Sequence, residues 1–406
     1  MQENCSDLII VDALLAQAAE GGAKGGHYLL PMLEESGFLV CQQSQAQPVW
    51  RLSCDAGCVV GLDLGGTKLY GALADMSGRI LAERSEPTRH DGEEATLEQL
   101  TSLVRDLQEE AGKEAGGLRA IGLGVPGFVS VETGSVTLSP NLSLPSDFRL
   151  DSRLSSLFGG CPVLMDNDVN FAVLGEYWRG EGRHLFFSGQ ERSRGNGSLA
   201  FLSLGTGIGL GLMMEGRRVR GASGGAGEIA YMPAGTDPFR AARTTFGGAY
   251  EDIVGTPGIR RRYGEGNVSV REIFDRAVAG ERKAAIVIDD TARQVAVGAA
   301  TIITLLDPQA IVLGGGIGSR AEFAKLIMEY TAELTPVQPR IAISRLGQRA
   351  GVTGAIMEAL LDIRRAMLRA DTSPKRGCDM ENREYVGSGN NASAAPPEVD
   401  KRAEAG

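Results

Sequence analysis

Short apolar runs that end at glycine recur along this chain. Each run is rich in aliphatic residues and too short for a helix, which predicts a buried strand followed by a glycine turn. The clearest runs cover residues 58–60, 199–204 and 310–313. After the first run, Gly65 and Gly66 precede apolar residues 69–74, and a further turn leads to residues 79–81. This pattern predicts a strand, a glycine turn, a strand, a second turn and a third strand.

The order of the apolar runs indicates an α/β protein with more than one domain. Strands and helices alternate from residue 58 to about 165, and longer helices with glycine turns dominate from 166 to about 346. With 406 residues, of which 43% are hydrophobic, the chain can bury more than one core. After about residue 369 the chain is polar and rich in Ser, Gly, Asn, Ala and Pro, which predicts a disordered tail.

Charge and cysteine content narrow the class of protein. The net charge of −10 argues against a general binder of nucleic acid or of membrane surfaces. No apolar stretch approaches the length of a membrane span, and the N-terminus lacks the pattern of a secretory signal. The six cysteines are scattered without a C-x-x-C pair, which favours free thiols over disulfides or zinc ligands. We therefore expect a cytoplasmic protein without a membrane partner.

The first glycine turn carries residues that suit a nucleotide. Gly65 and Gly66 let backbone N–H groups approach a phosphate, Thr67 adds a hydroxyl donor and Lys68 adds a cation. Asp63, just before the glycines, is placed to hold a metal-bound water. Taken alone, this turn is more safely interpreted as an ordinary hairpin with a Gly-Gly turn.

Two further turns have the same character. Gly205, Thr206 and Gly207 follow the apolar run at 199–204 and can wrap backbone donors around a second phosphate. Gly314 and Gly315 follow the third run and leave room for a flat adenosine against the backbone. Each turn is a weak signal by itself, but three of them at strand ends together indicate nucleotide binding.

The acid–base candidates follow a strand expected over residues 161–165. A helix is expected over about 169–178, and one residue of Asp166, Asn167 and Asp168 is needed as its N-cap. The remaining side chains are free to face a cleft. There Asp168 can accept a proton from a substrate hydroxyl, and Asn167 can hold neighbouring hydroxyls through its amide.

Three more polar side chains lie in glycine-rich or turn-like surroundings. Glu228, Glu251 and Asn141 can be ordinary solvated groups, or they can bind a polyhydroxylated ligand. The residues alone leave both interpretations open.

Two familiar nucleotide motifs are excluded. Residues 122–127 match G-x-G-x-x-G, but Pro126 and the apolar residues after it stand where that fingerprint needs a helix. The chain also lacks G-x-x-x-x-G-K-[ST], which excludes a P-loop kinase.

Together the motifs closely resemble the ROK family, named for repressors, open reading frames and sugar kinases. The resemblance covers about residues 58–367, and its pieces are DLGGTK, GVPG, SPNL, DNDVN, GTGIG, GGAGEI and VLGGGIG. It implies an actin-like ATPase (ribonuclease H-like) α/β fold with two lobes and a central cleft. The implied boundaries are 57–165 with a C-terminal helix 349–370 for the small lobe, 166–348 for the large lobe, 1–56 for a degenerate winged-helix-like segment and 371–406 for the disordered tail.

The resemblance also implies ligands and their contacts. ATP phosphates, with Mg²⁺, are implied at Asp63, Gly65, Gly66, Thr67, Lys68, Gly205, Thr206 and Gly207, and adenosine at Gly314 and Gly315. Sugar contacts are implied at Asn141, Asn167, Asp168, Glu228 and Glu251, with Asp168 as the base. A homodimer is implied as well.

One position departs from the family pattern. Family members commonly carry a histidine three residues after the glutamate of GEI, followed by cysteines that bind structural zinc. Here that position is Tyr231, and residues 229–250 contain neither Cys nor His. No structural zinc is therefore expected, and no metal-ligating residues are assigned. The Tyr231 hydroxyl can still bind a sugar.

The N-terminal segment raises the question of a regulator. Repressors of this family place a winged helix-turn-helix before the first glycine turn, and residues 32–40 and 48–52 resemble the end of its recognition helix and its wing. Residues 21–26 are glycine-rich where helices belong, and Lys24 is the only Lys or Arg before Arg51. Because a DNA-binding face needs clustered Lys and Arg, this acidic segment disfavours DNA as a partner.

We therefore predict an ATP- and Mg²⁺-dependent sugar kinase. Asp168 would take the proton from a hexose hydroxyl, the 6-hydroxyl, as that hydroxyl attacks the γ-phosphate. Lys68, Mg²⁺ and the turn amides would stabilise the charge in transfer. The alternative is a sugar-responsive transcriptional regulator that uses the same cleft as a sensor, and a third is a catalytically silent sugar-binding protein.

Overall fold

The computed structural model describes residues 39–42, 49–53, 56–130, 136–137, 148–187, 197–244 and 247–372. Met1–Ala366 form one compact unit, and Met367–Gly406 form a second, of which only the end of one helix is described. Asn141, most of the winged-helix-like segment and most of the tail lie outside the described residues, so the predictions made for them stay predictions.

Two five-stranded sheets form the framework of the first unit. The first sheet consists of β3 (Cys58–Leu64), β4 (Lys68–Asp75), β5 (Ile80–Pro87), β6 (Leu118–Val125) and β9 (Val163–Asn167). The second consists of β10 (Leu199–Leu204), β11 (Ile208–Met214), β12 (Arg217–Arg218), β13 (Ala310–Gly314) and β14 (Arg340–Ile343).

The two sheets share one topology. Their strand orders are β5-β4-β3-β6-β9 and β12-β11-β10-β13-β14. In each, the first three strands in sequence pair antiparallel, and the last two add in parallel on the other side of the first strand. The hairpins predicted at Gly65 and at Gly205 are confirmed as β3–β4 and β10–β11. A strand, β7 (Phe128–Val129), follows Gly127 where the dinucleotide fingerprint would need a helix.

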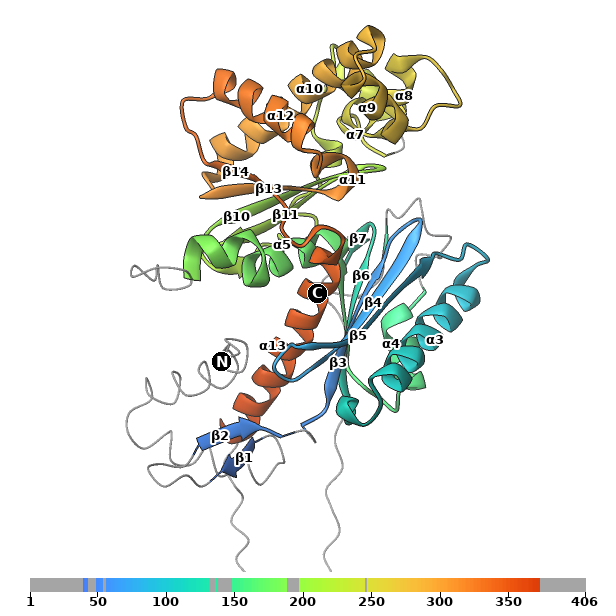
Figure 1. The fold of residues 1–406 in the computed structure, drawn as a ribbon, viewed down its shortest axis with the longest axis vertical. Coiled ribbons are helices and arrows are strands. Elements are labelled where there is room, and N and C mark those ends of the chain that lie inside the picture. Colours follow the sequence, from blue (N-terminus) through green and yellow to red (C-terminus); the bar gives the residue numbers. More distant parts are fainter. Residues whose placement is uncertain are drawn as a thin grey trace, which may run out of the picture. The chain divides into compact units, whose positions relative to one another are not determined.

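Helices pack on each sheet through apolar stripes. On the first sheet, α3 (Glu93–Ala111) and α4 (Leu150–Leu157) cover one face (Figure 1). Leu100, Leu103 and Leu107 of α3 are spaced by three and four residues, lie on one side of the helix and are fully buried against β3 and β4. On the second sheet, the long helices α10 (Arg282–Leu306) and α12 (Ala321–Leu334) pack over a second apolar core.

Apart from helices α5 (Asp168–Arg179) and α13 (Ala350–Thr372), which connect the two sheets, the other described elements are short. The helical ones are η2 (Gly112–Ala115), η3 (Arg183–Phe187), η4 (Ile229–Tyr231), α6 (Pro238–Thr244), α7 (Glu251–Val254), α8 (Thr256–Tyr263), α9 (Val270–Val278), α11 (Gly315–Gly318) and η5 (Gly347–Arg349). The extended ones are β8 (Val136–Thr137), paired with β7, and the antiparallel hairpin of β1 (Leu39–Gln42) and β2 (Val49–Leu52). Among the described residues, none of the helices combines the length and apolarity that crossing a membrane requires.

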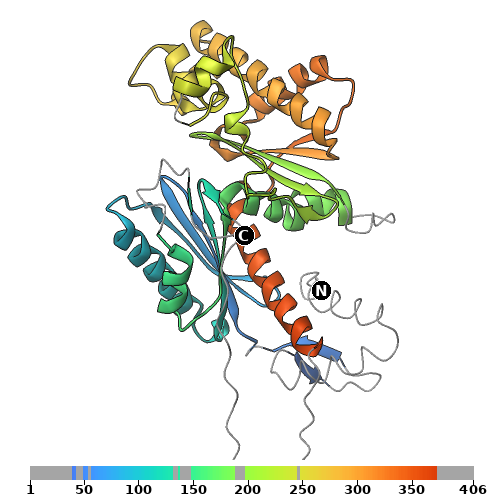
Figure 2. The ribbon, with the colours of Figure 1, turned by 180° about the vertical axis from the view of Figure 1, so that it is seen from behind.

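Two helices connect the sheets through glycine contacts. Helix α5 (Asp168–Arg179) packs on the second sheet, and α13 (Ala350–Thr372) packs on the first, on the face opposite α3 and α4 (Figure 2). A Cβ added at Gly354 would overlap the backbone carbonyl of Phe171, and one added at Gly175 would overlap that of Ala350. The backbones of α5 and α13 are therefore in direct contact, which a larger side chain at either glycine would prevent.

This contact predicts a stability effect. Gly354→Ala should lower the free energy of unfolding by about 1–3 kcal/mol, because the added methyl group must push the two backbones apart. Alanine favours a helix interior over glycine by about 1 kcal/mol, so helix propensity alone would give the opposite sign. Urea unfolding would measure the change. As a control, Gly266→Ala places a Cβ in open space and should stay within about 0.5 kcal/mol. Equal stabilities would show that the helix contact is not tight.

Candidate functional site

A pocket of about 310 Å³ lies where the first two glycine turns meet the start of α5. This volume is at the lower end of the range for small-molecule sites. The pocket brings together many of the side chains and turns singled out from the sequence. Those that line it are Gly66, Thr67, Asn167, Asp168, Gly205, Thr206, Gly207, Glu228, Tyr231 and Glu251. Asn170 and Ser203 also line the pocket and were not predicted as site residues.

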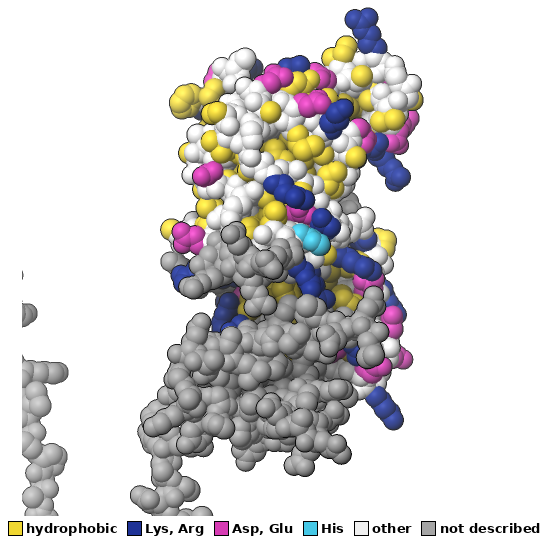
Figure 3. Space-filling view, turned by 60° about the vertical axis from the view of Figure 1, so that its left-hand side comes forward, with side chains coloured by type: hydrophobic (Ala, Val, Ile, Leu, Met, Phe, Trp, Pro, Cys, Tyr) yellow, Lys and Arg dark blue, Asp and Glu magenta, His cyan; other side chains and the backbone are white. Residues whose placement is uncertain are grey.

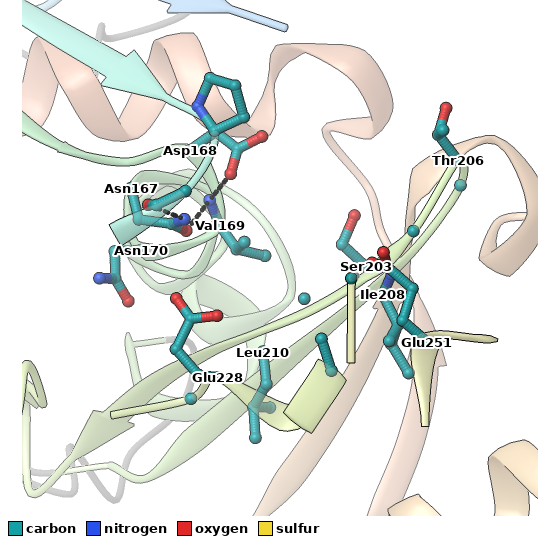
Figure 4. A pocket seen from close by; sticks show the side chains of 18 of the residues that line it. Asn167, Asp168, Val169, Asn170, Ser203, Thr206, Ile208, Leu210, Glu228 and Glu251 are labelled. Atoms are coloured by element: carbon teal, nitrogen blue, oxygen red, sulfur yellow. Dashed lines mark hydrogen bonds between the residues drawn. The ribbon is translucent and has the colours of Figure 1, made fainter. Parts of the chain in front are cut away.

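The close view separates the pocket into two sides (Figure 4). Polar residues from the start of α5 lie on one side with Glu228, and residues of the β10–β11 turn lie on the other with Glu251. The labelled α5 residues are Asn167, Asp168, Val169 and Asn170, and the labelled turn residues are Ser203, Thr206 and Ile208.

The first glycine turn is held by the end of β5. The N–H of Gly65 donates to the carbonyl of Lys68 (2.9 Å), and the Thr88 hydroxyl donates to the carbonyl of Gly65 (2.7 Å). The Lys68 ammonium donates to Oε1 of Gln348 (2.7 Å) and lies 5.2 Å from the centre of the Tyr70 ring. Lys68 therefore lies against the segment that enters α13, and the lining of the pocket does not include Asp63, Gly65 or Lys68.

The second glycine turn is held by the start of α8 and by Glu251. Thr256 donates its N–H to the carbonyl of Thr206 (3.0 Å) and its hydroxyl to the carbonyl of Gly205 (3.2 Å). The Glu251 carboxylate accepts the N–H of Ile208 (3.1 Å), and a Cβ at Gly207 would overlap that carboxylate. Glu251 thus supports the turn as well as lining the pocket.

The third glycine turn is explained by packing of the chain itself. A Cβ at Gly314 would overlap the Phe201 ring, and one at Gly315, whose φ is +77°, would overlap the backbone of Leu204. Glycine is required at both positions whether or not a ligand binds there. A Cβ at Gly316 would meet nothing within 4 Å, so the space beside the backbone is open at Gly316 and filled at Gly314 and Gly315.

Asp166, Asn167 and Asp168, at the start of α5, have three different roles. Asn167 is the N-cap of α5, because its Oδ1 accepts the N–H of Val169 (2.9 Å), and its Nδ2 donates to the carbonyl of Gly127 (2.8 Å). Asp166 is buried, is not among the residues that line the pocket and forms ion pairs with two arginines. Asp168 is left to face the pocket, with one oxygen accepting the N–H of Val169 (2.8 Å).

Carboxylates dominate the electrostatics of this region. Burial and the nearby charge of Asp168 raise the pKa of Asp63, and Lys68 partly offsets that increase. Burial and the charge of Glu228 raise the pKa of Asp168, whereas the Val169 N–H opposes the change. Burial also raises the pKa of Glu228 and of Glu251. Among the described residues that line the pocket, none is Lys, Arg or His, so its acidic groups lack a cationic partner there.

This arrangement restricts what the pocket can do. A half-buried carboxylate with a raised pKa, facing a cavity, is suited to accept a proton from a bound hydroxyl. The amides of Asn167 and Asn170 can both donate to and accept from a polyhydroxylated ligand, and the carboxylates of the two glutamates can accept from its hydroxyls. Within the described ranges, no cluster of three or more His, Cys, Asp and Glu side chains could hold a metal ion. A divalent cation here would therefore need oxygen atoms from a ligand as well.

Comparison with known families identifies the chain. The model described as "ROK family" matches residues 59–360. The chain belongs to the ROK family. The actin-like ATPase fold predicted from the sequence is confirmed by this match and by solved ROK structures. The repeated sheet topology is the structural form of that fold in this chain.

Curated relatives of this ROK protein include both kinases and repressors. A glucokinase of Halalkalibacterium halodurans is 29% identical over 322 residues, which cover 73% of this chain and 92% of that protein. A xylose repressor of Caldicellulosiruptor bescii is 26% identical over 387 residues, which cover 89% of this chain and 88% of that protein.

Solved structures of ROK proteins resemble this chain over most of the described fold. The ROK hexokinase from Thermus thermophilus has a TM-score of 0.62 and 31% identity, and the match covers 76% of this chain and 99% of that one. A ROK glucokinase from Streptomyces griseus, solved in complex with glucose and AMPPNP, has a TM-score of 0.60 and 23% identity, covering 74% and 99% of the two chains.

Proposed function

We propose that this ROK protein is an ATP-dependent hexose kinase with Asp168 as its general base. The observation that carries the proposal is the position of Asp168, a half-buried carboxylate that faces a pocket also lined by two glycine turns. We further propose the lobe boundaries 57–165 with 349–370, and 166–348, around the first and second sheets.

The sugar would bind on the α5 side of the pocket. Asn167, Asn170 and Glu228 offer donors and acceptors for its hydroxyls. Tyr231 also lines the pocket and adds a hydroxyl. Asp168 would accept the proton of the 6-hydroxyl as that oxygen attacks the γ-phosphate. Burial supports this role, because it raises the pKa of Asp168 and makes the carboxylate a better base.

The phosphates would bind on the side of the glycine turns. Gly66 and Thr67 from the first turn, and Gly205 to Gly207 from the second, line the pocket. The Gly205 N–H is already donated to the carbonyl of Gly207 (3.0 Å), so the other N–H groups of the turns and the threonine hydroxyls would bind the phosphates. Adenosine would extend toward Gly316, where the backbone is open. In this proposal Lys68 would exchange Gln348 for a phosphate oxygen.

The residues present also fit Mg²⁺, which proteins bind through one or two carboxylates together with substrate phosphates. Asp63 is such a carboxylate, because it is half-buried, the charge of Asp168 raises its pKa, and a cation beside it would stabilise its charged form. When bound, Mg²⁺ would neutralise charge on the phosphates. Asp63 would hold the ion or its water, and the backbone of Gly351 at the start of α13 lies against the same carboxylate.

The comparisons support a kinase at a coarser level. The relatives include glucokinases and other sugar kinases, and one solved neighbour contains glucose and an ATP analogue. A coupled assay across a panel of hexoses would identify which sugar this chain uses.

The first test is removal of the base. Asp168→Asn keeps the shape of the side chain but cannot accept the proton, so kcat for the best hexose should fall by about 10²–10⁴-fold. A coupled ADP assay across a panel of hexoses would measure it. Asp106→Asn, a change to an exposed carboxylate of α3, should leave kcat unchanged. Full activity in Asp168→Asn, or no phosphorylation of any hexose by the wild type, would contradict the proposal.

The second test is the pH dependence of turnover. Burial and Glu228 raise the pKa of Asp168 to about 6, and the base must be deprotonated, so kcat should fall as the pH drops below about 6. In Glu228→Gln the neighbouring charge is absent, so the pKa of Asp168 should decrease and the acid limb should move to lower pH. An acid limb that stays in place would show that Glu228 does not act on the base.

A sugar-responsive regulator is the second candidate. The xylose repressor matches 89% of this chain and the glucokinase only 73%, so the repressor match includes residues outside the kinase-like region. On the face in Figure 3, the described Lys and Arg side chains are interspersed with acidic and hydrophobic ones, which does not favour DNA binding there.

Binding to DNA from upstream of its own gene, weakened by salt and released by a hexose, would support the regulator. The absence of binding at low salt would count against it. The homodimer and the winged-helix character of residues 1–56 remain predictions in either case.

A further inference from the structure

Asp166 holds the pocket loop without entering the pocket. Its side chain is 7% exposed, and its Oδ1 accepts both the backbone N–H of Asn167 (2.8 Å) and the Nδ2 of Asn170 (2.9 Å). Both donors belong to residues that line the pocket. One oxygen of Asp166 therefore fixes the residues on either side of Asp168.

The other oxygen of Asp166 faces two arginines. Its Oδ2 accepts from Nε of Arg220 (2.7 Å) and lies 3.3 Å from Nη2 of Arg218. The same Nη2 lies 3.0 Å from Oε2 of Glu358, on α13, and the Arg218 and Glu358 side chains are each 9% exposed. Arg365 forms an ion pair with the second oxygen of Glu358 at 3.2 Å. A chain of buried charges thus connects the pocket loop to α13.

This chain of charges is poorly explained by stability. Taking arginine and carboxylate groups out of water is costly, and well-packed apolar residues often stabilise a fold as much or more. Arg218 also leaves Nε and Nη1 without hydrogen-bond partners in the described structure, while its guanidinium lies 5.2 Å from the centre of the Phe171 ring. The ion pairs of Arg218 with Asp166 and Glu358 are directional, which suits a role in fixing the position of the loop before α5.

Helix α13 contacts Asp63 near its start and the Asp166–Arg218 ion pair further along, through Glu358. Near its start, a Cβ at Gly351 would lie 2.6 Å from an oxygen of Asp63. Glu358 follows seven residues later, about two helical turns along the same helix. Asp63 and the Asp166 loop are therefore supported by one rigid element.

We propose that Asp166, Arg218 and Glu358 form a positioning cluster that fixes Asp168 relative to the phosphate side of the pocket through α13. Arg218 and Glu358 act on the loop through Asp166 and do not touch substrate. The effect on turnover rests on the proposed kinase function, whereas the effect on the loop does not.

The variant Arg218→Met/Glu358→Met tests this cluster. Arg218→Met alone would leave two buried carboxylates with too little countercharge and can fail to fold. In the double variant, one positive and one negative charge are lost together, so its urea midpoint should match or exceed that of the wild type. Hydrogen exchange at the backbone of residues 163–170 should nevertheless be faster, with exchange in α3 unchanged.

Turnover should change in a way that lost stability does not produce. We expect kcat to fall by up to about 100-fold, because a base displaced by about 1 Å loses alignment with the hydroxyl. The acid limb should move to lower pH, because a looser loop exposes Asp168 to water and lowers its pKa. The single variant Arg218→Lys keeps the positive charge beside Asp166 and should retain more of the wild-type kcat than the double variant does. Ile273→Ala, a core change in α9, should lower the urea midpoint but leave kcat and loop exchange unchanged.

Wild-type exchange in residues 163–170 together with wild-type kcat in the double variant would overturn the proposal. A wild-type protein that phosphorylates no hexose would instead refute the proposed function. In that case the exchange measurement would still test the cluster, and unchanged exchange would overturn it.

Discussion

Helices α5 and α13 touch backbone to backbone because Gly175 and Gly354 have no side chains at the point where they cross. Helix α5 carries Asp168 at its first turn and packs on the second sheet, and α13 begins beside Asp63 and packs on the first. At its far end α5 also holds the chain that enters α13, since the buried Glu176 carboxylate accepts the N–H of Leu346 (3.0 Å). The distance between Asp168, on α5, and Asp63, beside α13, therefore depends on this pair of helices.

The charges near the pocket are arranged in two contrasting ways. Asp166 is surrounded by arginines and amide donors, so its charge is fully used in holding the loop. Asp168, two residues later, faces a pocket whose described lining contains no cation, and burial raises its pKa. Two carboxylates in one short segment thus acquire different chemistry from their surroundings, which is how protein folds separate structural from reactive acids.

Local patterns in the sequence were sufficient for much of the fold. Apolar runs that end at glycine correctly predicted β10 and the hairpins at Gly65 and Gly205, because strand periodicity and turn geometry depend on neighbouring residues. The polar residues before α5 predicted a capped helix, and Asn167 is the cap. Family resemblance supplied the two-lobed fold, which periodicity alone would not have specified.

Contacts between distant residues were not accessible in this way. Lys68 lies against Gln348, which is 280 residues later in the chain, and Arg218 pairs with Glu358, which is 140 residues later. No pattern near Asp166 in the sequence indicates that Arg218 and Arg220 will form ion pairs with it. The glycines at 314 and 315 illustrate a second difficulty, because close packing of the chain itself requires glycine at both positions, and the sequence pattern does not separate that cause from room for a ligand.

The most direct test of the account is a crystal structure of the protein with glucose and a non-hydrolysable ATP analogue. The account predicts that a sugar hydroxyl lies within hydrogen-bond reach of the Asp168 carboxylate, about 2.6–3.2 Å, with the phosphates against the turns at Gly66 and at Gly205 to Gly207. A sugar whose hydroxyls all lie away from Asp168, or phosphates bound outside those turns, would contradict it.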